Sequence, residues 1–336
     1  MDKTLASLLA PGKGILAADE SFPTLGKRFA ALSIASTEES RLAYRSMLFS
    51  TPGLAEFISG AILFDETIRQ RTEVGAIPEC LAAEAIIPGI KVDRGTIAMP
   101  GFPGEKLTEG IDGLRERLAE YRGLGARFTK WRAVIAIGGP APTRGCIESN
   151  AHSLALFAAL SQEAGLVPIV EPEVLMDGAH SLERCEEVTD FTLDAVFNAL
   201  SLQRVALERI LLKTGMVLSG KDCSEQAGEE AVARATLRCL RRSVPAAVPG
   251  IVFLSGGQSD IAATRRLNAI CSSGGSPWKL SFSFGRALQD FAMMTWRGDA
   301  ANAKAAQAAL LRRARCNSLA VQGKYSDQEE RWTREE

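Results

Sequence analysis

The sequence predicts an α/β protein that folds as a single-domain TIM barrel, that is, an eight-stranded (β/α)₈ barrel. Three observations favour this fold: eight short apolar runs recur along the chain, segments with helical spacing separate them, and polar residues follow almost every run. A doubly wound open sheet is the alternative for such an alternation of strands and helices. The barrel is favoured because all eight strand ends then meet at one rim.

The eight apolar runs are rich in Val, Ile and Phe, as buried parallel strands are. We expect strands at residues 14–18, 61–64, 86–92, 128–137, 167–170, 210–212, 251–254 and 280–284. The chain has 336 residues, of which 46% are hydrophobic, so it holds enough apolar material for a large core.

Helical spacing is clear between several of these runs. Val188, Phe191 and Val196 lie on the apolar stripe of one predicted helix. Ser36 and Glu39 have the spacing of a capping box, which predicts the start of another helix.

The domain organisation follows from the absence of Pro/Gly-rich linkers and low-complexity blocks. We expect one barrel domain over residues 1–325 and a charged, loose carboxyl-terminal tail over residues 326–336.

Composition excludes several classes of function and location. The formal net charge is −1 and Lys and Arg do not form runs, so no nucleic-acid or membrane-surface partner is expected. No stretch approaches the roughly 20 apolar residues that span a bilayer, and the amino terminus lacks a secretory pattern. The seven cysteines are isolated and include no C-x-x-C, which predicts reduced thiols and a cytoplasmic location.

Metal and cofactor chemistry is also not expected. The chain has only two histidines, His152 and His180, and no H-x-x-x-H or His/Cys cluster. Neither a P-loop nor a dinucleotide fingerprint is present, so we predict no metal and no cofactor.

Charged residues two positions apart occur at the ends of several predicted strands. Because alternate residues of a strand face the same side, each pair would point the same way. Burying charges without partners is costly, so these pairs fit a shared site better than loop solubility. The pairs are Lys91 with Asp93, Lys130 with Arg132, and Glu171 with Glu173.

Lys213 directly follows a buried predicted strand and could serve as a nucleophile. Desolvation and nearby cations such as Lys130 or Arg132 would favour the neutral amine that Schiff-base chemistry needs. The alternative is a lysine that only extends from the barrel end to solvent. Glu171 and Glu173, on the preceding strand, could supply the acid/base group that Schiff-base formation requires.

Glycine-containing segments follow the seventh and eighth predicted strands, where barrels often bind phosphate through backbone N–H groups. The first contains Ser255 and Gly256, and the second contains Gly285 and Arg286. Lys91, with Arg28 or Lys27, could hold a second anion across the rim. This excess of cations suits a substrate that carries phosphate groups.

Eight segments together resemble class I fructose-bisphosphate aldolase over residues 10–325. Each alone is weakly specific, but their joint occurrence in this order is highly specific. They are APGKGILAADES at 10–21, GIKVD at 89–93, KWR at 130–132, IVEPE at 169–173, LLK at 211–213, LSGGQS at 254–259, GRALQ at 285–289 and QGKY at 322–325.

The resemblance implies a lyase that cleaves fructose 1,6-bisphosphate reversibly to dihydroxyacetone phosphate and glyceraldehyde 3-phosphate in glycolysis and gluconeogenesis. Lys213 would form the Schiff base and Glu171 would act as acid/base. Asp19 and Lys130 would orient and polarise the C4 hydroxyl, and Glu173 would hold this network in place.

The resemblance also implies how the sugar phosphate, the expected small-molecule partner, is bound. The C1 phosphate would bind to Ser255, Gly256, Gly285 and Arg286. The C6 phosphate would approach Arg28 and Lys91, with Thr24 and Arg132 as further candidates. A homo-oligomer, namely a homotetramer, is implied as well.

Three departures from the family pattern affect these expectations. The usual Leu-Leu-Lys-Pro-Asn-Met becomes a segment in which Lys213 is followed by Thr214 and Gly215. The usual Thr-Gly-Ser after the first acidic motif becomes residues 22–24, Phe-Pro-Thr. Animal members end in a tyrosine that assists carbanion protonation, whereas this sequence ends in Arg-Glu-Glu, so we expect proton return that is slower or uses another group.

Two alternatives stay open at this point. The altered 22–24 segment is compatible with a Schiff-base aldolase that prefers fructose 1-phosphate or sedoheptulose 1,7-bisphosphate. A non-catalytic barrel that serves as a binding scaffold is the other alternative, because fold alone does not imply activity.

Overall fold

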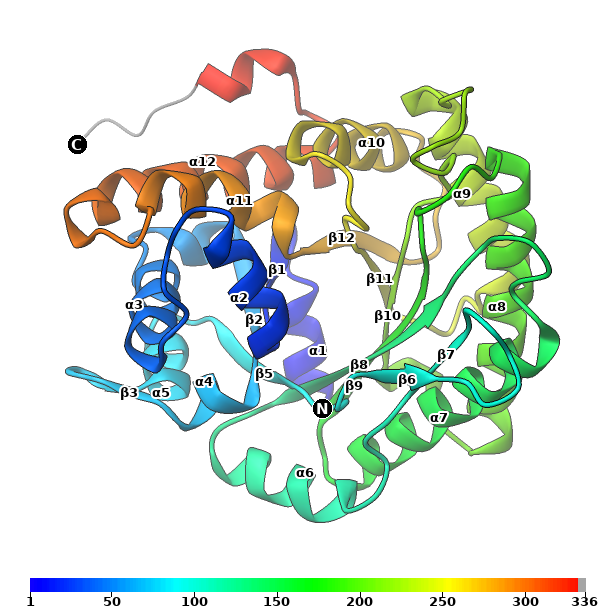
Figure 1. The fold of residues 1–336 in the computed structure, drawn as a ribbon, viewed down its shortest axis with the longest axis horizontal. Coiled ribbons are helices and arrows are strands. Elements are labelled where there is room, and N and C mark those ends of the chain that lie inside the picture. Colours follow the sequence, from blue (N-terminus) through cyan, green and yellow to red (C-terminus); the bar gives the residue numbers. More distant parts are fainter. Residues whose placement is uncertain (332–336) are drawn as a thin grey trace.

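The computed structural model of the protein describes residues 1–331, and the predicted tail residues 332–336 lie outside this range. Eight parallel strands close into a barrel in the order β1-β12-β11-β10-β9-β8-β5-β2, and helices surround them (Figure 1). The TIM-barrel prediction is therefore confirmed and the open-sheet alternative is excluded.

All eight predicted runs are barrel strands, with ends that differ by a few residues. The strands are β1 (Gly14–Ala18), β2 (Ile58–Leu63), β5 (Ile87–Lys91), β8 (Phe128–Ile135), β9 (Val167–Val174), β10 (Leu211–Thr214), β11 (Gly250–Phe253) and β12 (Lys279–Phe284). Two short antiparallel hairpins, which the sequence did not predict, lie outside the barrel. They are β3 (Arg71–Thr72) with β4 (Gly75–Ala76), and β6 (Thr96–Ala98) with β7 (Lys106–Thr108).

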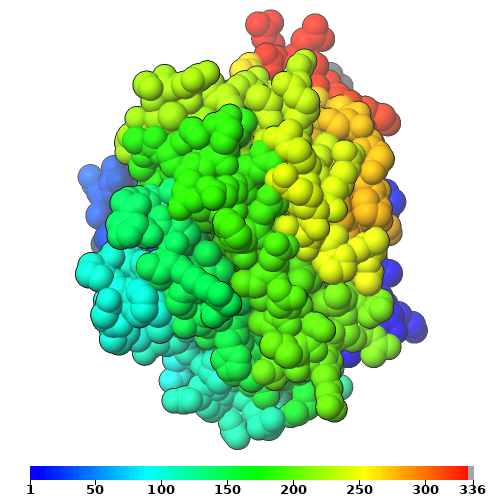
Figure 2. All heavy atoms as spheres, turned by 90° about the vertical axis from the view of Figure 1, so that its right-hand side faces the viewer, coloured from blue at the N-terminus to red at the C-terminus, as the bar shows by residue number. Residues whose placement is uncertain are grey.

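The helices follow the strands as the pattern predicts. They are α1 (Asp2–Leu8), α2 (Phe22–Ala30), α3 (Glu38–Phe49), α4 (Asp65–Arg69), α5 (Ile77–Ala83), α6 (Leu114–Gly123), α7 (Arg144–Glu163), α8 (Leu182–Leu202), α9 (Glu229–Ser243), α10 (Asp260–Ser272), α11 (Arg286–Trp296) and α12 (Ala303–Val321). Turning the molecule by 90° shows the middle of the chain, in green and yellow, as a continuous outer layer in which α8 packs between α7 and α9 (Figure 2).

Two local helix predictions need correction. The capping box at the start of α3 uses Thr37 and Ser40, one residue after the predicted pair, because the Thr37 hydroxyl accepts the Ser40 N–H at 3.2 Å. Phe191 of α8 is 59% exposed, whereas Val188 and Val196 are buried. Phe191 therefore lies outside the face that packs on the barrel.

The base of the barrel is filled by apolar side chains. Leu8 and Leu9, at the end of α1, pack into an inner cluster with Phe128 and other strand residues. Two glycines make room for this packing, because a Cβ at Gly89 would meet the Phe128 ring at 2.3 Å and one at Gly250 would meet Leu9 at 2.4 Å. The interior of the barrel is thus a packed core below the rim.

The described part of the predicted tail forms a short 3₁₀ helix, η4 (Asp327–Arg331). Its acidic side chains contact basic side chains of α10 and α12: Asp327 lies 2.7 Å from Arg265, and Glu330 lies 2.5 Å from Arg313. These ion pairs hold residues 327–331 against the barrel helices.

Two further findings concern the described chain as a whole. No helix within residues 1–331 combines the length and apolarity that crossing a membrane requires. All seven cysteines are free thiols.

Candidate active site

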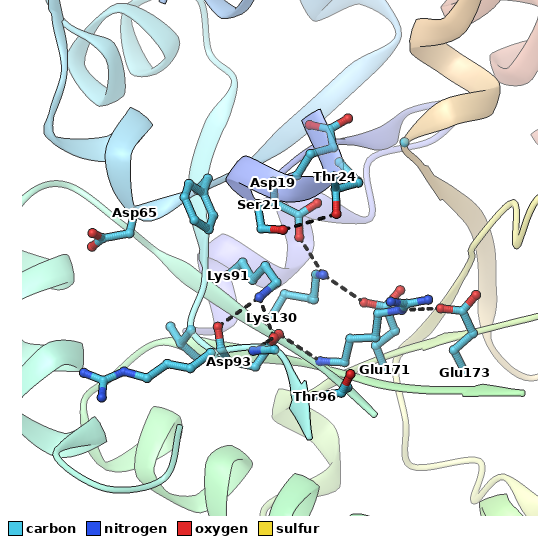
Figure 3. Close-up of a pocket in the computed structure, with 18 of the residues that line it drawn as sticks. Asp19, Ser21, Thr24, Asp65, Lys91, Asp93, Thr96, Lys130, Glu171 and Glu173 are labelled. Atoms are coloured by element: carbon cyan, nitrogen blue, oxygen red, sulfur yellow. Dashed lines mark hydrogen bonds and ion pairs between the residues drawn. The ribbon is translucent and has the colours of Figure 1, made fainter. Parts of the chain in front are cut away.

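A cavity of about 1270 Å³ opens at the carboxyl ends of the barrel strands. Side chains from the ends of β1, β5, β8, β9 and β10 point into it, together with residues of α2 (Figure 3). The cavity brings together every residue that the sequence predicted as part of the site. These residues are Asp19, Thr24, Arg28, Lys91, Lys130, Arg132, Glu171, Glu173, Lys213, Ser255, Gly256, Gly285 and Arg286.

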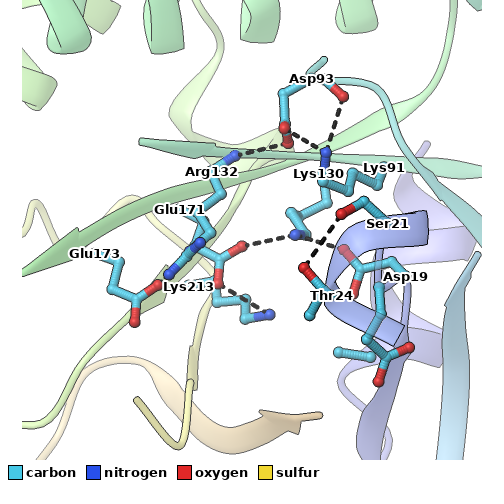
Figure 4. A network of polar contacts seen from close by, with 12 residues as sticks. Asp19, Ser21, Thr24, Lys91, Asp93, Lys130, Arg132, Glu171, Glu173 and Lys213 are labelled. Carbon is cyan, nitrogen blue, oxygen red and sulfur yellow. Dashed lines mark hydrogen bonds and ion pairs between the residues drawn. The ribbon is translucent and has the colours of Figure 1, made fainter. Parts of the chain in front are cut away.

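Four of these side chains form a buried row of alternating charge (Figure 4). Lys130 Nζ lies 2.5 Å from Asp19 Oδ2 and 3.2 Å from Glu171 Oε2. Glu171 Oε1 lies 3.1 Å from Lys213 Nζ. Each lysine thus contacts at least one carboxylate, which compensates for the removal of these four charges from water.

Burial and the lysines act in opposite directions on the carboxyl groups. Burial alone would raise the pKa of Asp19, but the charges of Lys130, Lys213 and Lys91 outweigh it and lower the pKa to about 2. For Glu171, burial again raises the pKa, and Lys130, Lys213 and Arg132 together lower it. Both carboxyls are therefore ionised at neutral pH.

Lys130 is also shifted by this arrangement. Burial favours its neutral form, but Asp19, Glu171 and Asp93 outweigh burial and raise the pKa of its ammonium group. Lys130 thus remains positively charged beside Glu171.

Strand alternation explains why these side chains face the cavity. Lys130 points inward from β8, while its neighbour Trp131 points outward and stacks on Phe157 of α7, with ring centroids 5.7 Å apart. In the parallel ladder, Lys130 is level with Ile169 and Arg132 is level with Glu171. This register brings the cations of β8 beside the carboxylates of β9.

A second set of polar contacts surrounds the buried row. Glu173 pairs with the Arg132 guanidinium. Asp93 pairs with Lys91 and also accepts the backbone N–H of Arg132 at 3.3 Å and that of Gly95 at 3.1 Å. Asp93 therefore joins the ends of β5 and β8; its pairing with Lys91 at the rim was predicted, but no role in the site was assigned to it.

The predicted phosphate loops lie on the opposite wall of the cavity. Ser255 is buried after β11, and Gly256 adopts a positive φ of 58°. Gly285 caps α11, whose first residue is the exposed Arg286. Backbone N–H groups at the start of a helix and an adjacent guanidinium together favour an anion.

Ser283 belongs to the same wall and was missed by the sequence analysis. It is the next-to-last residue of β12, lines the cavity and is 1% exposed, and its hydroxyl has no hydrogen-bond partner within the described chain. Its position two residues before Gly285 on a predicted strand was the sequence feature that could have revealed it.

Arg28 and Thr24 approach the cavity from α2. Arg28 pairs with Glu20 and lies 2.8 Å from Asp290 Oδ1, so two carboxylates already contact its guanidinium. Thr24 is exposed, and its hydroxyl lies 3.2 Å from that of Ser21. The pairing of Arg28 with Asp290 could not be predicted because the two residues are 262 positions apart in the sequence.

A metal-binding cluster is not found among residues 1–331, where no three His, Cys, Asp or Glu side chains group as possible ligands.

Comparison with known proteins identifies the family to which the chain belongs. A sequence model of class I fructose-bisphosphate aldolase matches residues 1–336. The chain belongs to the class I fructose-bisphosphate aldolase family.

Relatives in this family are similar over almost their whole length. A protein of Xanthomonas axonopodis pv. citri named probable fructose-bisphosphate aldolase class 1 is 55% identical over 325 residues, which are 96% of this chain and 97% of that protein. Fructose-bisphosphate aldolase of Dictyostelium discoideum is 50% identical over 97% of this chain and 92% of its own.

A solved structure shares the fold of this family member. Fructose-bisphosphate aldolase of Plasmodium falciparum, solved in complex with TRAP and a small-molecule inhibitor, has a TM-score of 0.95 and 49% identity. The match covers 97% of this chain and 94% of that one.

Proposed function

We propose that this family member cleaves fructose 1,6-bisphosphate reversibly to dihydroxyacetone phosphate and glyceraldehyde 3-phosphate, a lyase reaction of glycolysis and gluconeogenesis, through a Schiff base on Lys213. The observation that carries the proposal is the contact of 3.1 Å between Lys213 Nζ and Glu171 Oε1 inside the barrel mouth. A buried amine beside a carboxylate is the pair that Schiff-base formation needs.

The first half of the reaction forms the Schiff base. Lys213 gives its proton to Glu171, and the neutral amine attacks the C2 carbonyl of the sugar. The resulting carbinolamine loses water when Glu171 returns a proton to the departing hydroxyl. The iminium that remains has a positive charge next to C3.

The second half breaks the carbon–carbon bond. Glu171, again a carboxylate, takes the proton of the C4 hydroxyl, and the C3–C4 bond breaks as C4 becomes an aldehyde. The electron pair of that bond moves to C3 and into the iminium, which becomes an enamine. Protonation at C3 and hydrolysis then release dihydroxyacetone phosphate and restore Lys213.

Lys130 and Asp19 assist the cleavage step. The positive charge of Lys130, held by Asp19 at 2.5 Å, lies where negative charge develops on the C4 oxygen. Glu173 acts indirectly. It pairs with Arg132, and this pairing fixes the Arg132 side chain, which lies beside Glu171. The role of Glu173 is therefore positional.

The phosphates are bound at opposite walls of the cavity. Ser255, Gly256, Gly285 and Arg286 hold the C1 phosphate through N–H, hydroxyl and guanidinium donors. Lys91, Arg132, Arg28 and Thr24 receive the C6 phosphate, which requires Arg28 and Lys91 to exchange a carboxylate partner for the substrate.

A preference for fructose 1-phosphate or sedoheptulose 1,7-bisphosphate is the second candidate, because Arg28 is already paired with Glu20 and Asp290. The ratio of kcat/KM values for the monophosphate and the two bisphosphates decides between them. A clear preference for fructose 1,6-bisphosphate supports the main proposal.

Borohydride reduction in the presence of dihydroxyacetone phosphate tests the proposed Schiff base. We expect a stable adduct on Lys213 by peptide mass analysis. Lys213→Arg keeps the positive charge beside Glu171 but should give no adduct. An unmodified wild-type chain would instead favour the non-catalytic scaffold.

The cellular setting is proposed on narrower grounds. We propose a cytoplasmic location, since a 50% identical relative from Arabidopsis thaliana is named as cytosolic. We also propose a homotetramer on the basis of the family, which analytical ultracentrifugation can test.

A further inference from the structure

The loop that follows β10 carries a lysine that the proposed mechanism does not use. Lys221 lies eight residues after Lys213, in the segment that connects β10 to α9. Its backbone N–H donates to the Met176 carbonyl oxygen at 2.8 Å, and the neighbouring Gly220 N–H donates to the His180 carbonyl oxygen at 2.8 Å. The loops after β9 and β10 are thus tied together, and the backbone position of Lys221 is fixed.

Gly220 allows this close approach of the two loops. A Cβ at position 220 would lie 2.2 Å from the carbonyl oxygen of Gly178. Only glycine fits without moving the backbone. The crossing of the loops places Lys221 beside the phosphate-binding wall of the cavity.

Lys221 and Arg286 both lie close to Gly257. A Cβ at Gly257 would be 3.6 Å from Lys221 Nζ and 3.4 Å from Arg286 Nη2. Gly257 directly follows Gly256, the predicted phosphate-binding glycine, and has a positive φ of 93°. Two cations therefore converge on the same backbone turn.

An acidic residue balances these cations in the present arrangement. Asp177 Oδ1 lies 2.9 Å from Lys221 Nζ, and both side chains are about half exposed, at 66% and 45% respectively. The hydrogen bond from Lys221 outweighs burial and lowers the pKa of Asp177, and the charge of Arg286 adds to this effect. Asp177 thus pairs with Lys221, and the charge of Arg286 also favours its ionised form.

We propose that Lys221 is a phosphate-binding residue of this enzyme, which leaves Asp177 and joins Arg286 when a phosphate group occupies the turn at Gly256 and Gly257. The proposal rests on the proposed function, because the ligand is the C1 phosphate of the sugar. An exposed ion pair such as Lys221 with Asp177 contributes little by itself and is readily exchanged. A phosphate dianion offers more charge and more acceptor oxygens than the single carboxylate.

The experiment measures how borohydride trapping of Lys213 depends on the concentration of dihydroxyacetone phosphate. This ligand carries a single phosphate, so its half-saturating concentration reports on the C1 phosphate subsite alone. The variants are Lys221→Ala, Lys221→Arg and Asp177→Asn. Lys304→Ala, which removes an exposed lysine from α12, is the control for the loss of one positive charge.

The half-saturating concentration should shift in opposite directions when Lys221 and when Asp177 is replaced. Lys221→Ala should raise the half-saturating concentration about three- to fivefold, which is the range for one exposed charge contact. Lys221→Arg should stay near the wild type. Asp177→Asn should lower the concentration about twofold, because the competing carboxylate is gone.

Two controls separate this proposal from the proposed function. Dihydroxyacetone, which lacks a phosphate, should be trapped equally by the wild type and Lys221→Ala. Unchanged half-saturation in both Lys221→Ala and Asp177→Asn, with normal adduct formation, would overturn the role of Lys221 only. Absence of any adduct in the wild type would instead overturn the Schiff-base mechanism.

Discussion

The buried row of charges and the outer cations of the cavity are both neutralised by opposite charges, but their partners differ in how firmly they are held. In the buried row, Asp19, Lys130, Glu171 and Lys213 are at most 9% exposed, and rigid strands hold them. Their partners are fixed because an unpaired charge there would be costly.

The outer cations lie on loops and helix ends and have exchangeable partners. Arg28 and Lys221 are held by carboxylates that a substrate phosphate can replace. The difference indicates that the chemistry depends on fixed geometry, whereas phosphate affinity depends on competition between anions. Substitutions in the two regions should therefore differ in size and in the kinetic constant that they change.

The largest effect is expected at the centre of the buried row. Glu171→Gln keeps the shape of the side chain but removes the proposed proton carrier and the shared counter-ion of two lysines. We expect kcat to fall by about 10²- to 10⁴-fold, the usual range for a general acid/base. Stopped-flow and steady-state assays measure this, and a change in KM alone would contradict the assignment.

A smaller effect is expected from Asp19 on stability. The lysines around Asp19 lower its pKa from the ordinary value of 3.8, taken here for the unfolded chain, to about 2 in the folded protein. Ionised Asp19 therefore stabilises the fold by about 2 kcal/mol at neutral pH. This contribution is complete above the unfolded pKa and is lost as the pH falls through the folded pKa.

Urea unfolding of the wild type and Asp19→Asn at several pH values measures this contribution. The gap in unfolding free energy should be widest above about pH 5 and should narrow between about pH 4 and pH 2. A gap that is independent of pH would show that Asp19 acts through shape and not through charge.

Arg286 extends the comparison to the outer region. Arg286→Ala should raise KM for fructose 1,6-bisphosphate by about tenfold, as the loss of a charge-assisted hydrogen bond to phosphate does, with a smaller change in kcat. Arg286→Lys should recover part of the affinity, because it keeps the charge without the planar fork. Equal losses in kcat and kcat/KM would place Arg286 with the chemical step.

The smallest effect is expected at Thr24, where the hydroxyl is exposed and bonded only to Ser21 among its described neighbours. Thr24→Ala should raise KM for the bisphosphate about two- to threefold, a typical loss for one neutral hydrogen bond. The KM for fructose 1-phosphate should not change. A matching rise for the monophosphate would exclude Thr24 from the C6-phosphate contact.

The sequence predicted the positions of the strands better than their limits. Runs of Val, Ile and Phe located all eight strands, but β2 begins at Ile58, three residues before the predicted start, because Ser59 and Gly60 interrupt the apolar pattern. Strand β9 continues through Glu171 and Glu173 to Val174, since pairing with β8 maintains the ladder through polar residues.

Charge pairing was less predictable than the membership of the site. Spacing placed Lys130 and Glu171 on neighbouring strands, but it could not show that Glu173 pairs with Arg132 or that Asp93 bridges two strands. Such contacts depend on side-chain reach and on partners far apart in the chain. The short hairpins β3–β4 and β6–β7 were missed because they contribute little apolar surface.

The inner apolar cluster that contains Leu8, Leu9 and Phe128 limits the route by which substrate and products reach and leave the cavity. Since this end of the barrel is closed by apolar side chains, the sugar enters and both three-carbon fragments leave through the opposite end, where the cavity opens. In the proposed mechanism, the aldehyde fragment is not covalently attached and can depart while the ketone half is still bound to Lys213. A single opening thus favours an ordered release of the two products, in which the aldehyde leaves first.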